Sequence, residues 1–319
     1  MDRMDPDAAA AVAEIEALGV PEWHTLSVES ARRLEADVFT PESLPPIPFV
    51  RDLAIPGRGG EIPLRVYRPR PLGADGGEAP DALPVLVFSH GGGWVLGTLD
   101  SAGSICRELA RRAGCVVVSV DYRLAPEHPF PAAVEDAYTA LSWVASHAET
   151  VGGDPTRIAV GGTSAGGTLA AATALRARDA DGPDVAHQLL CYPATDDAFD
   201  TDSYRENADG PLLTKADMEW FWAQYLRSPV DAANPYAVPM RAADVTDLSS
   251  ATVVTGGFDP LRDDGFAYAD RLAHGGADVT RIHAPRLPHA FLSLTDAVPR
   301  ADEAMDAVAE SLADALDAA

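Results

Sequence analysis

Lysine is almost absent from this chain of 319 residues: Lys215 is the only lysine among 24 basic residues, and the others are arginines. Aspartate and glutamate together number 49, which gives a formal net charge of −25. Nucleic acids and anionic membrane surfaces bind proteins through basic patches. The charge therefore argues against both as partners.

The acidic, lysine-poor composition admits two interpretations. Carboxylates hold water and counterions, and salt screens the repulsion between them, so such a surface is typical of adaptation to salt. A GC-rich coding bias, which favours Arg, Ala, Asp and Gly, accounts for the same composition. Both interpretations stay open at this point.

Cysteines are few, and long apolar runs are missing. Cys106, Cys115 and Cys191 are odd in number and match no metal-binding spacing, so we expect buried free thiols in a reducing compartment and no metal site. The first residues are acidic and lack the apolar segment of a signal peptide. No run of about 20 apolar residues exists to cross a membrane. We therefore expect a cytoplasmic protein.

Short apolar runs that alternate with helical periodicity make up most of the chain. The hydrophobic content of 47% is enough for a sizeable core. Expected strands lie at 64–67, 85–88, 115–120, 158–160, 189–190, 252–254 and 279–283; expected helices lie at 101–113, 132–147, 165–178, 262–274 and 300–318. Buried strands alternating with helices predict an α/β fold with a mostly parallel sheet covered on both faces.

Two regions depart from this alternation. Helices are expected at 7–18 and 27–38, with Ser27 and Ser30 as candidate N-caps, before a proline-rich stretch. Residues 194–240 show no clear strand but contain an aromatic helix, which is typical of an insertion that covers a site. The predicted division is 1–48 for the N-terminal part of a helical cap, 49–192 and 241–319 for the core, and 193–240 for the cap insertion. A glycine-rich loop is expected at 72–82.

The segment GTSAG, residues 162–166, fits the G-x-S-x-G pattern of a nucleophile elbow. It follows an apolar strand and opens an alanine-rich helix, which is the context that a nucleophilic serine requires. The pattern recurs by chance, and the alternative is a glycine-rich turn with a capping serine. The context favours Ser164 as a nucleophile.

The segment HGGGW, residues 90–94, directly follows another apolar strand. Consecutive glycines let the backbone approach a substrate and turn N–H groups toward a developing oxyanion. A phosphate-binding loop is the competing interpretation, but the Lys-Ser/Thr that would follow is missing. Gly92, Gly93 and the residue after the nucleophile, Ala165, are therefore candidate oxyanion donors.

Asp259 and His289 each follow an expected strand, and the order Ser, Asp, His is the one that α/β-hydrolases use. Histidine can take the serine proton near neutral pH, and an aspartate fixes its tautomer and stabilises the imidazolium. Asp263 and Asp264 are rival acids. They are expected inside the first turn of the next helix, where carboxylates favour the helix dipole.

Together with DYRLAPEHPFPAA at 121–133 and FDPLRDDG at 258–265, these motifs resemble the hormone-sensitive lipase family of bacterial and archaeal esterases. The likeness runs over nearly the whole chain. It implies an eight-stranded α/β-hydrolase fold with a helical cap, and carboxylester hydrolysis without a cofactor or metal. It also implies catalytic Ser164, Asp259 and His289. One departure is Thr163, which stands where the commoner motif has aspartate.

The expected activity is hydrolysis of short- to medium-chain carboxylic esters, with a small-molecule ester as the partner. Trp94, Trp220 and Trp222 are candidate substrate-binding residues that would confine the pocket. The resemblance leaves a homodimer open. Alternatives are an amidase or deacetylase on the same scaffold, and a non-catalytic small-molecule receptor, although receptors of this fold generally lack a triad member.

Overall fold

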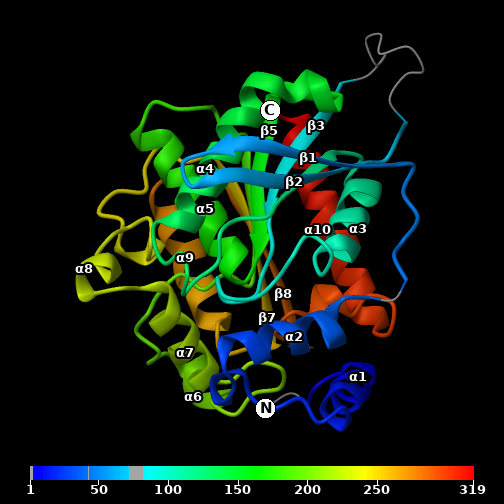
Figure 1. Cartoon of the computed structure of the whole chain (residues 1–319), viewed down its shortest axis with the longest axis vertical. Coiled ribbons are helices and arrows are strands. Elements are labelled where there is room, and N and C mark those ends of the chain that lie inside the picture. Colours follow the sequence, from blue (N-terminus) through cyan, green and yellow to red (C-terminus); the bar gives the residue numbers. More distant parts are fainter. Residues whose placement is uncertain (1–2, 42, 72–81) are drawn as a thin grey trace.

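The centre of the molecule is a β-sheet. The structure is a computed structural model that describes residues 3–41, 43–71 and 82–319. Within this described part, the sheet has eight strands in the order β1-β2-β4-β3-β5-β6-β7-β8 (Figure 1). The strands are β1 (Phe49–Gly57), β2 (Gly60–Arg68), β3 (Leu83–Ser89), β4 (Val116–Val120), β5 (Gly153–Thr163), β6 (His187–Cys191), β7 (Ser250–Phe258) and β8 (Val279–Pro288). Only the β1–β2 and β2–β4 pairs of this sheet are antiparallel, which confirms the predicted mostly parallel sheet.

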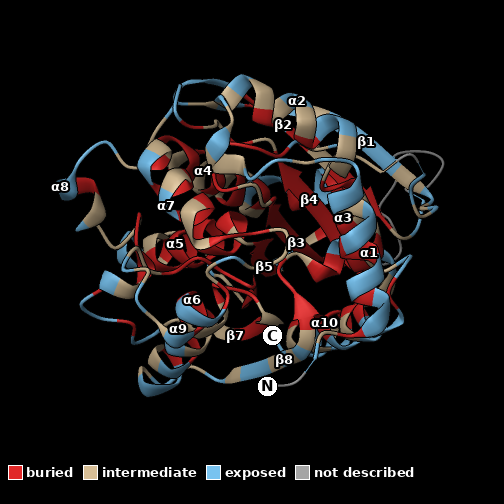
Figure 2. Ribbon diagram, turned by 90° about the horizontal axis from the view of Figure 1, so that it is seen from below, coloured by how far each residue is buried: buried red, intermediate tan, exposed pale blue. Residues whose placement is uncertain are grey.

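Helices cover both faces, because successive side chains of a strand point to opposite sides. In β3, Val85 and Val87 belong to one hydrophobic core, whereas Leu86 and Phe88 belong to a second. The first core is completed by α4, α5 and α9, and the second by α3 and α10. These helices are α3 (Gly103–Ala113), α4 (Ala132–His147), α5 (Ala165–Asp179), α9 (Arg262–His274) and α10 (Pro299–Asp317). Figure 2 shows the buried strands inside and the exposed outer faces of the helices.

A second group of helices lies at one end of the sheet, where α1, α2, α6 and α7 gather in Figure 1. Its members come from the start of the chain and from the segment between β6 and β7. They are α1 (Pro6–Ala17), η1 (Trp23–Thr25), α2 (Val28–Phe39), α6 (Asp202–Glu206), α7 (Lys215–Tyr225) and α8 (Pro229–Ala232). Three short 3₁₀ helices elsewhere are η2 (Ala148–Val151), η3 (Pro239–Arg241) and η4 (Phe291–Ser293).

Side-chain caps explain where the helices of this second group begin. Ser27 accepts a hydrogen bond from the Ser30 N–H and is the N-cap of α2, as the sequence predicts. Thr214 and Asp217 form a capping box at the start of α7. The same Asp217 carboxylate accepts the backbone N–H of His24 at 2.9 Å and contacts its Nδ1 at 3.0 Å. Asp217 therefore ties the N-terminal segment to the insertion.

One strand was not predicted. β1 lies at the edge of the sheet and only Ile55 in it is buried, so its sequence lacks apolar alternation. The expected helices at 7–18, 27–38, 101–113, 132–147, 165–178, 262–274 and 300–318 all form, within two residues of the expected ends. Residues 72–81 of the expected loop at 72–82 lie outside the described residues.

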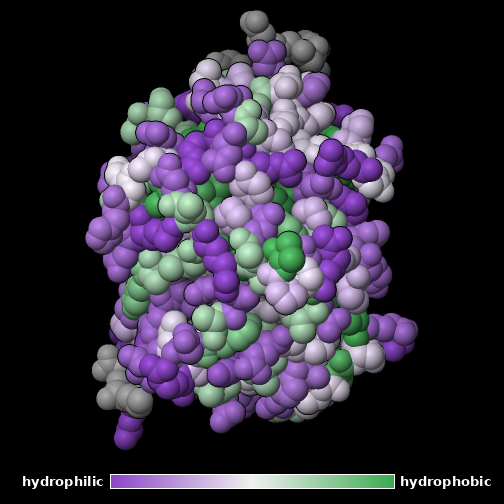
Figure 3. Space-filling model, turned by 90° about the vertical axis from the view of Figure 1, so that its left-hand side faces the viewer, coloured by the Kyte–Doolittle hydropathy of each residue, from purple (hydrophilic) through white to green (hydrophobic). Residues whose placement is uncertain are grey.

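The surface is mostly hydrophilic on the face that Figure 3 presents, and its hydrophobic side chains occur in small separate groups. The large hydrophobic side chains that are exposed among the described residues are Leu18, Leu44, Val50 and Val230. The three cysteines are buried and free. Of the helices in the described ranges, none is both long enough and apolar enough to span a membrane.

Candidate active site

Ser164 lies at the sharp turn between β5 and α5, with φ 54° and ψ −120°. A positive φ is costly for a residue with a side chain and persists only where the surroundings enforce it. The residues two positions before and after Ser164 are glycines because nothing larger fits there. A Cβ at Gly162 would lie 2.4 Å from the Ser89 carbonyl oxygen, and one at Gly166 would lie 1.9 Å from the same oxygen. The GTSAG segment thus packs against the end of β3 and projects Ser164 from the sheet edge.

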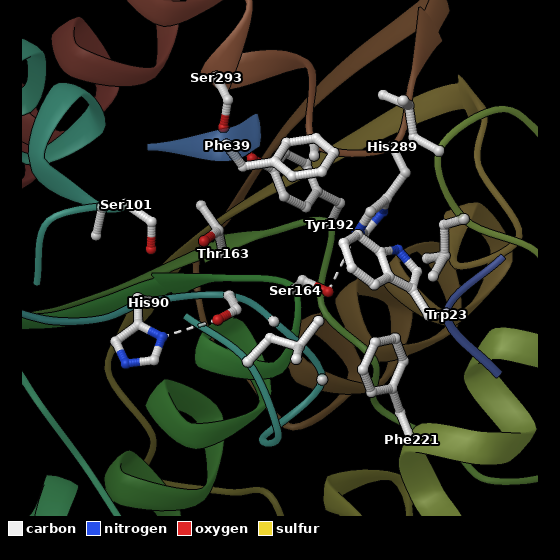
Figure 4. Close-up of a pocket in the computed structure, with 18 of the residues that line it drawn as sticks. Trp23, Phe39, His90, Ser101, Thr163, Ser164, Tyr192, Phe221, His289 and Ser293 are labelled. Atoms are coloured by element: carbon white, nitrogen blue, oxygen red, sulfur yellow. Dashed lines mark hydrogen bonds between the residues drawn. The ribbon is translucent and has the colours of Figure 1, made fainter. Parts of the chain in front are cut away.

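A continuous line of hydrogen bonds joins Ser164, His289 and Asp259. The Ser164 Oγ lies 3.1 Å from His289 Nε2 (Figure 4). His289 Nδ1 lies 2.8 Å from Asp259 Oδ2. Asp259 is fully buried, and its Oδ1 accepts the Leu261 N–H at 2.8 Å. A carboxylate only accepts, so Nδ1 carries the ring proton and Nε2 is left to accept from the serine hydroxyl.

The topology brings these residues together. Ser164 follows β5, Asp259 follows β7 and His289 follows β8, so all three lie at the carboxyl edge of neighbouring parallel strands. The rival acids lie in the first turn of α9, as expected. Asp263 accepts the Ser203 N–H and pairs with Arg262. Burial raises the pKa of Asp264 well above its ordinary value.

The glycine loop after β3 runs beside Ser164. Gly92 and Gly93 have φ values of 108° and 59°, a region that favours glycine. A Cβ at Gly93 would lie 2.2 Å from the Phe221 ring of α7. Ala165 is the first residue of α5, where backbone N–H groups have no partner within the helix and the dipole favours negative charge. Gly92 and Gly93 line the same cavity as Ser164, and Ala165 is the next residue along the chain.

His90 fixes the course of this loop from behind. Its ring stacks on Tyr122 at 4.2 Å, and the Tyr122 hydroxyl donates to the His90 carbonyl at 2.9 Å. Complete burial lowers the pKa of His90 to about 4, so the ring is neutral at pH 7. Nδ1 lies 2.8 Å from the Gly91 carbonyl and therefore donates to it. In Figure 4 the ring points away from Ser164.

Ser164 and His289 open into a cavity of about 190 Å³. Its lining is mostly apolar, and its aromatic rings are Trp23, Phe39, Tyr192 and Phe221. Trp23 belongs to η1, Phe39 ends α2 and Phe221 lies on α7, so both parts of the second group of helices contribute walls. Figure 4 shows these three rings placed around Ser164 and His289.

Comparisons with known proteins agree with this geometry. A family model described as alpha/beta hydrolase fold matches residues 86–293. The Mycobacterium tuberculosis esterase LipI is 47% identical over 257 residues, which cover 80% of this chain and 78% of LipI. The carboxylic ester hydrolase LipN of the same organism is 49% identical over 251 residues, which cover 77% of this chain and 65% of LipN.

A solved structure adds likeness in three dimensions. The thermostable esterase from Pseudomonas putida ECU1011 superposes with a TM-score of 0.91 at 36% identity, over 99% of this chain and 98% of that one. The chain belongs to the hormone-sensitive lipase-like esterases of the α/β-hydrolase fold.

The three tryptophans that the sequence suggested as substrate-binding residues do not line the cavity of this chain. Trp94 is fully buried, stacks on Tyr225 at 4.3 Å and lies 4.5 Å from Trp222. Of the described residues that line the cavity, none is Trp94, Trp220 or Trp222. On α7, Met218 and Phe221 line the cavity instead.

The sequence did not predict that the cavity would be lined by Trp23, Phe39, Phe221 and Leu212. For Phe221 the sequence does carry a pattern: Met218 and Phe221 are three residues apart, so they lie on one face of α7. Trp23 and Phe39 carried no such signal, since they lie in a loop-like segment and at a helix end.

Thr163, the departure from the commoner family motif, is buried beside the glycine loop. A Cβ at Gly91 would lie 3.1 Å from its Oγ1. A neutral side chain here adds no negative charge next to the position where an oxyanion would form. Among the described residues, no group of three or more His, Cys, Asp or Glu side chains is placed to hold a metal ion.

Proposed function

We propose that this chain is a carboxylesterase that hydrolyses short- to medium-chain esters through Ser164, His289 and Asp259. The observation that carries the proposal is the line of two hydrogen bonds, 3.1 and 2.8 Å long, at the floor of an apolar cavity. Residues 1–48 and 193–240 act as the cap, because their helices supply the cavity walls.

In the acylation step, the Ser164 hydroxyl attacks the ester carbonyl while His289 Nε2 takes its proton. Asp259 stabilises the imidazolium that forms, and its burial strengthens this interaction. The N–H groups of Gly92, Gly93 and Ala165 donate to the oxyanion. The imidazolium then protonates the leaving alcohol, and the acyl group remains on Ser164.

In the deacylation step, His289 takes a proton from a water molecule that attacks the acyl carbon. The same N–H groups hold the second oxyanion, and the proton returns to Ser164 as the acid leaves. His289 thus serves as base and then as acid in each half of the cycle. These steps need only the residues named and water.

The cavity supports the preference for short and medium chains. A cavity of about 190 Å³ that is bordered by three aromatic rings suits a small acyl group better than a long one. The measurement is kcat/KM for p-nitrophenyl esters from acetate to palmitate. Faster hydrolysis of the palmitate than the butyrate would contradict the preference.

The deciding experiment compares Ser164→Ala with Ser142→Ala on p-nitrophenyl butyrate. We expect kcat to fall on the order of 10⁴-fold or more for Ser164→Ala. Ser142 lies on α4, and its hydroxyl donates only to the preceding turn, so its variant should keep full activity. A fluorophosphonate probe should label the wild type but not Ser164→Ala. Substantial activity in Ser164→Ala would overturn the proposal, and a panel of amides run beside the esters tests the amidase alternative.

A further inference from the structure

The active-site cavity has a neighbour of similar size. A second cavity of about 200 Å³ lies between the last turn of α1, the chain that follows it, and the segment before α7. Trp23, Phe39 and Leu212 line both cavities. These three side chains therefore form a partition, with Ser164 on one side and the second cavity, which is partly open to solvent, on the other.

The partition is held in place by contacts outside it. The Trp23 and Phe39 rings lie 5.7 Å apart and cross at 47°. Residue 24, next to Trp23, is bound by its backbone N–H and its ring to Asp217, a residue that also caps α7. Leu212 has φ 66°, a strained value for leucine that persists because its surroundings enforce it. These contacts hold the partition residues in defined positions.

We propose that Trp23 sets the upper length of the ester that the enzyme accepts; this inference rests on the proposed esterase activity. When the Trp23 ring is absent, the second cavity receives the far end of longer esters. The large indole of Trp23 ends the catalytic cavity at the partition. Removing the ring joins the two cavities, because Trp23 borders both. Each further methylene that gains an apolar place then favours binding about fourfold.

The lining of the second cavity predicts which far ends it accepts. Its titratable members among the described residues are Glu16, Glu22, Asp209 and Asp217, and all four are acidic. Only Asp217 is buried, and it is already bonded to His24 and Thr214. A far end that enters this cavity should therefore be tolerated when it is neutral or cationic and rejected when it is a carboxylate.

The test is a chain-length profile of Trp23→Ala in two series, p-nitrophenyl esters of C2 to C12 acids and acetates of C2 to C12 alcohols. We expect kcat/KM for C8 relative to C2 to rise at least tenfold in one series. That series identifies the part of the ester that faces Trp23. Trp143→Ala removes an equal ring from α4, far from both cavities, and should leave the profile unchanged.

Two further measurements show whether the second cavity receives the chain. Val20 lines only the second cavity, so Val20→Trp added to Trp23→Ala should refill it and restore the wild-type profile. In Trp23→Ala, an ester with an ω-ammonium end should be hydrolysed at least fivefold faster than one with an ω-carboxylate end of equal length. The wild type should show a smaller ratio.

The outcomes separate this inference from the proposed function. A wild type that hydrolyses no ester contradicts the function itself. A Trp23→Ala enzyme that keeps C2 activity but shifts in neither series contradicts the role of Trp23 alone. If Trp23→Ala does not fold, Phe39→Ala opens the same partition from α2 and is held to the same expected profile.

Discussion

Gly93 and Phe221 pack so closely that a Cβ on the glycine would lie 2.2 Å from the phenyl ring. The glycine belongs to the loop beside Ser164, and the phenylalanine belongs to helix α7 of the insertion. The loop that is placed to receive an oxyanion and the helix that closes the cavity are therefore positioned against each other. Neither can shift without the other.

Substituting Gly93→Ala should lower kcat for p-nitrophenyl butyrate about 10²-fold or more, the usual loss when an oxyanion donor is displaced. The new methyl group meets the ring, and φ of 59° is unfavourable for alanine. Adding Phe221→Ala removes the steric conflict and should recover part of the loss. If Gly93→Ala alone retained a third of the wild-type kcat, the close contact between Gly93 and Phe221 would not matter for catalysis.

Asp259→Asn should lower kcat about 10⁴-fold, as the loss of the carboxylate that fixes the histidine tautomer does in other serine hydrolases. The matched control is Asp263→Asn, four residues away, whose carboxylate pairs with Arg262 and caps the Ser203 N–H. The control should keep more than a tenth of the activity. Equal losses in the two variants would show that Asp259 has no special role.

The meeting of the candidate catalytic residues could be predicted from the sequence, because each is encoded locally and placed by topology. Ser164, Asp259 and His289 each follow a buried strand, and parallel strands bring their carboxyl ends to one edge. The walls of the cavity could not be predicted in this way. Trp23 and Phe39 reach Ser164 only through the docking of distant segments, and no local pattern records that docking.

The difference between local pattern and long-range packing also explains why the tryptophans expected to bind substrate do not line the cavity. Aromatic residues on α7 were correctly placed on a helix over the site, but the side of the helix that each faces depends on packing. Met218 and Phe221 face the cavity, whereas Trp222 lies against the buried Trp94. The edge strand β1 was missed for a related reason, because it buries too little for its sequence to alternate.

Acid should destabilise the fold through His187, whose ring is bonded to the Ser250 and Thr252 hydroxyls. Burial lowers its pKa to about 4 from 6.5. The free energy of unfolding is therefore unaffected by this group above pH 6.5. It decreases by up to about 3 kcal/mol as the pH falls from 6.5 toward 4, because the unfolded chain takes up the proton first. Urea unfolding at pH 7 and pH 4.5 measures the loss. His187→Gln should shrink the difference, and the exposed His274→Gln should leave it unchanged.

Salt should stabilise the chain, because its net charge is −25. The Debye length falls from ~30 Å at 0.01 M to ~3 Å at 1 M, which screens the repulsion between surface carboxylates. We expect Tm to rise by several degrees between these concentrations, about 2–4 °C for each kcal/mol gained. Near pH 4.5, the isoelectric point, the rise should shrink. A steady fall in Tm and activity with NaCl would favour coding bias as the origin of the composition.

Two of the three partition residues, Trp23 and Phe39, lie near the start of the sequence, whereas the proposed base is His289. A ribosome synthesises the chain from its N-terminus, so Trp23 and Phe39 are made long before His289. A chain that stops after residue 164 but before residue 289 therefore contains Ser164 but lacks the histidine that we propose activates it.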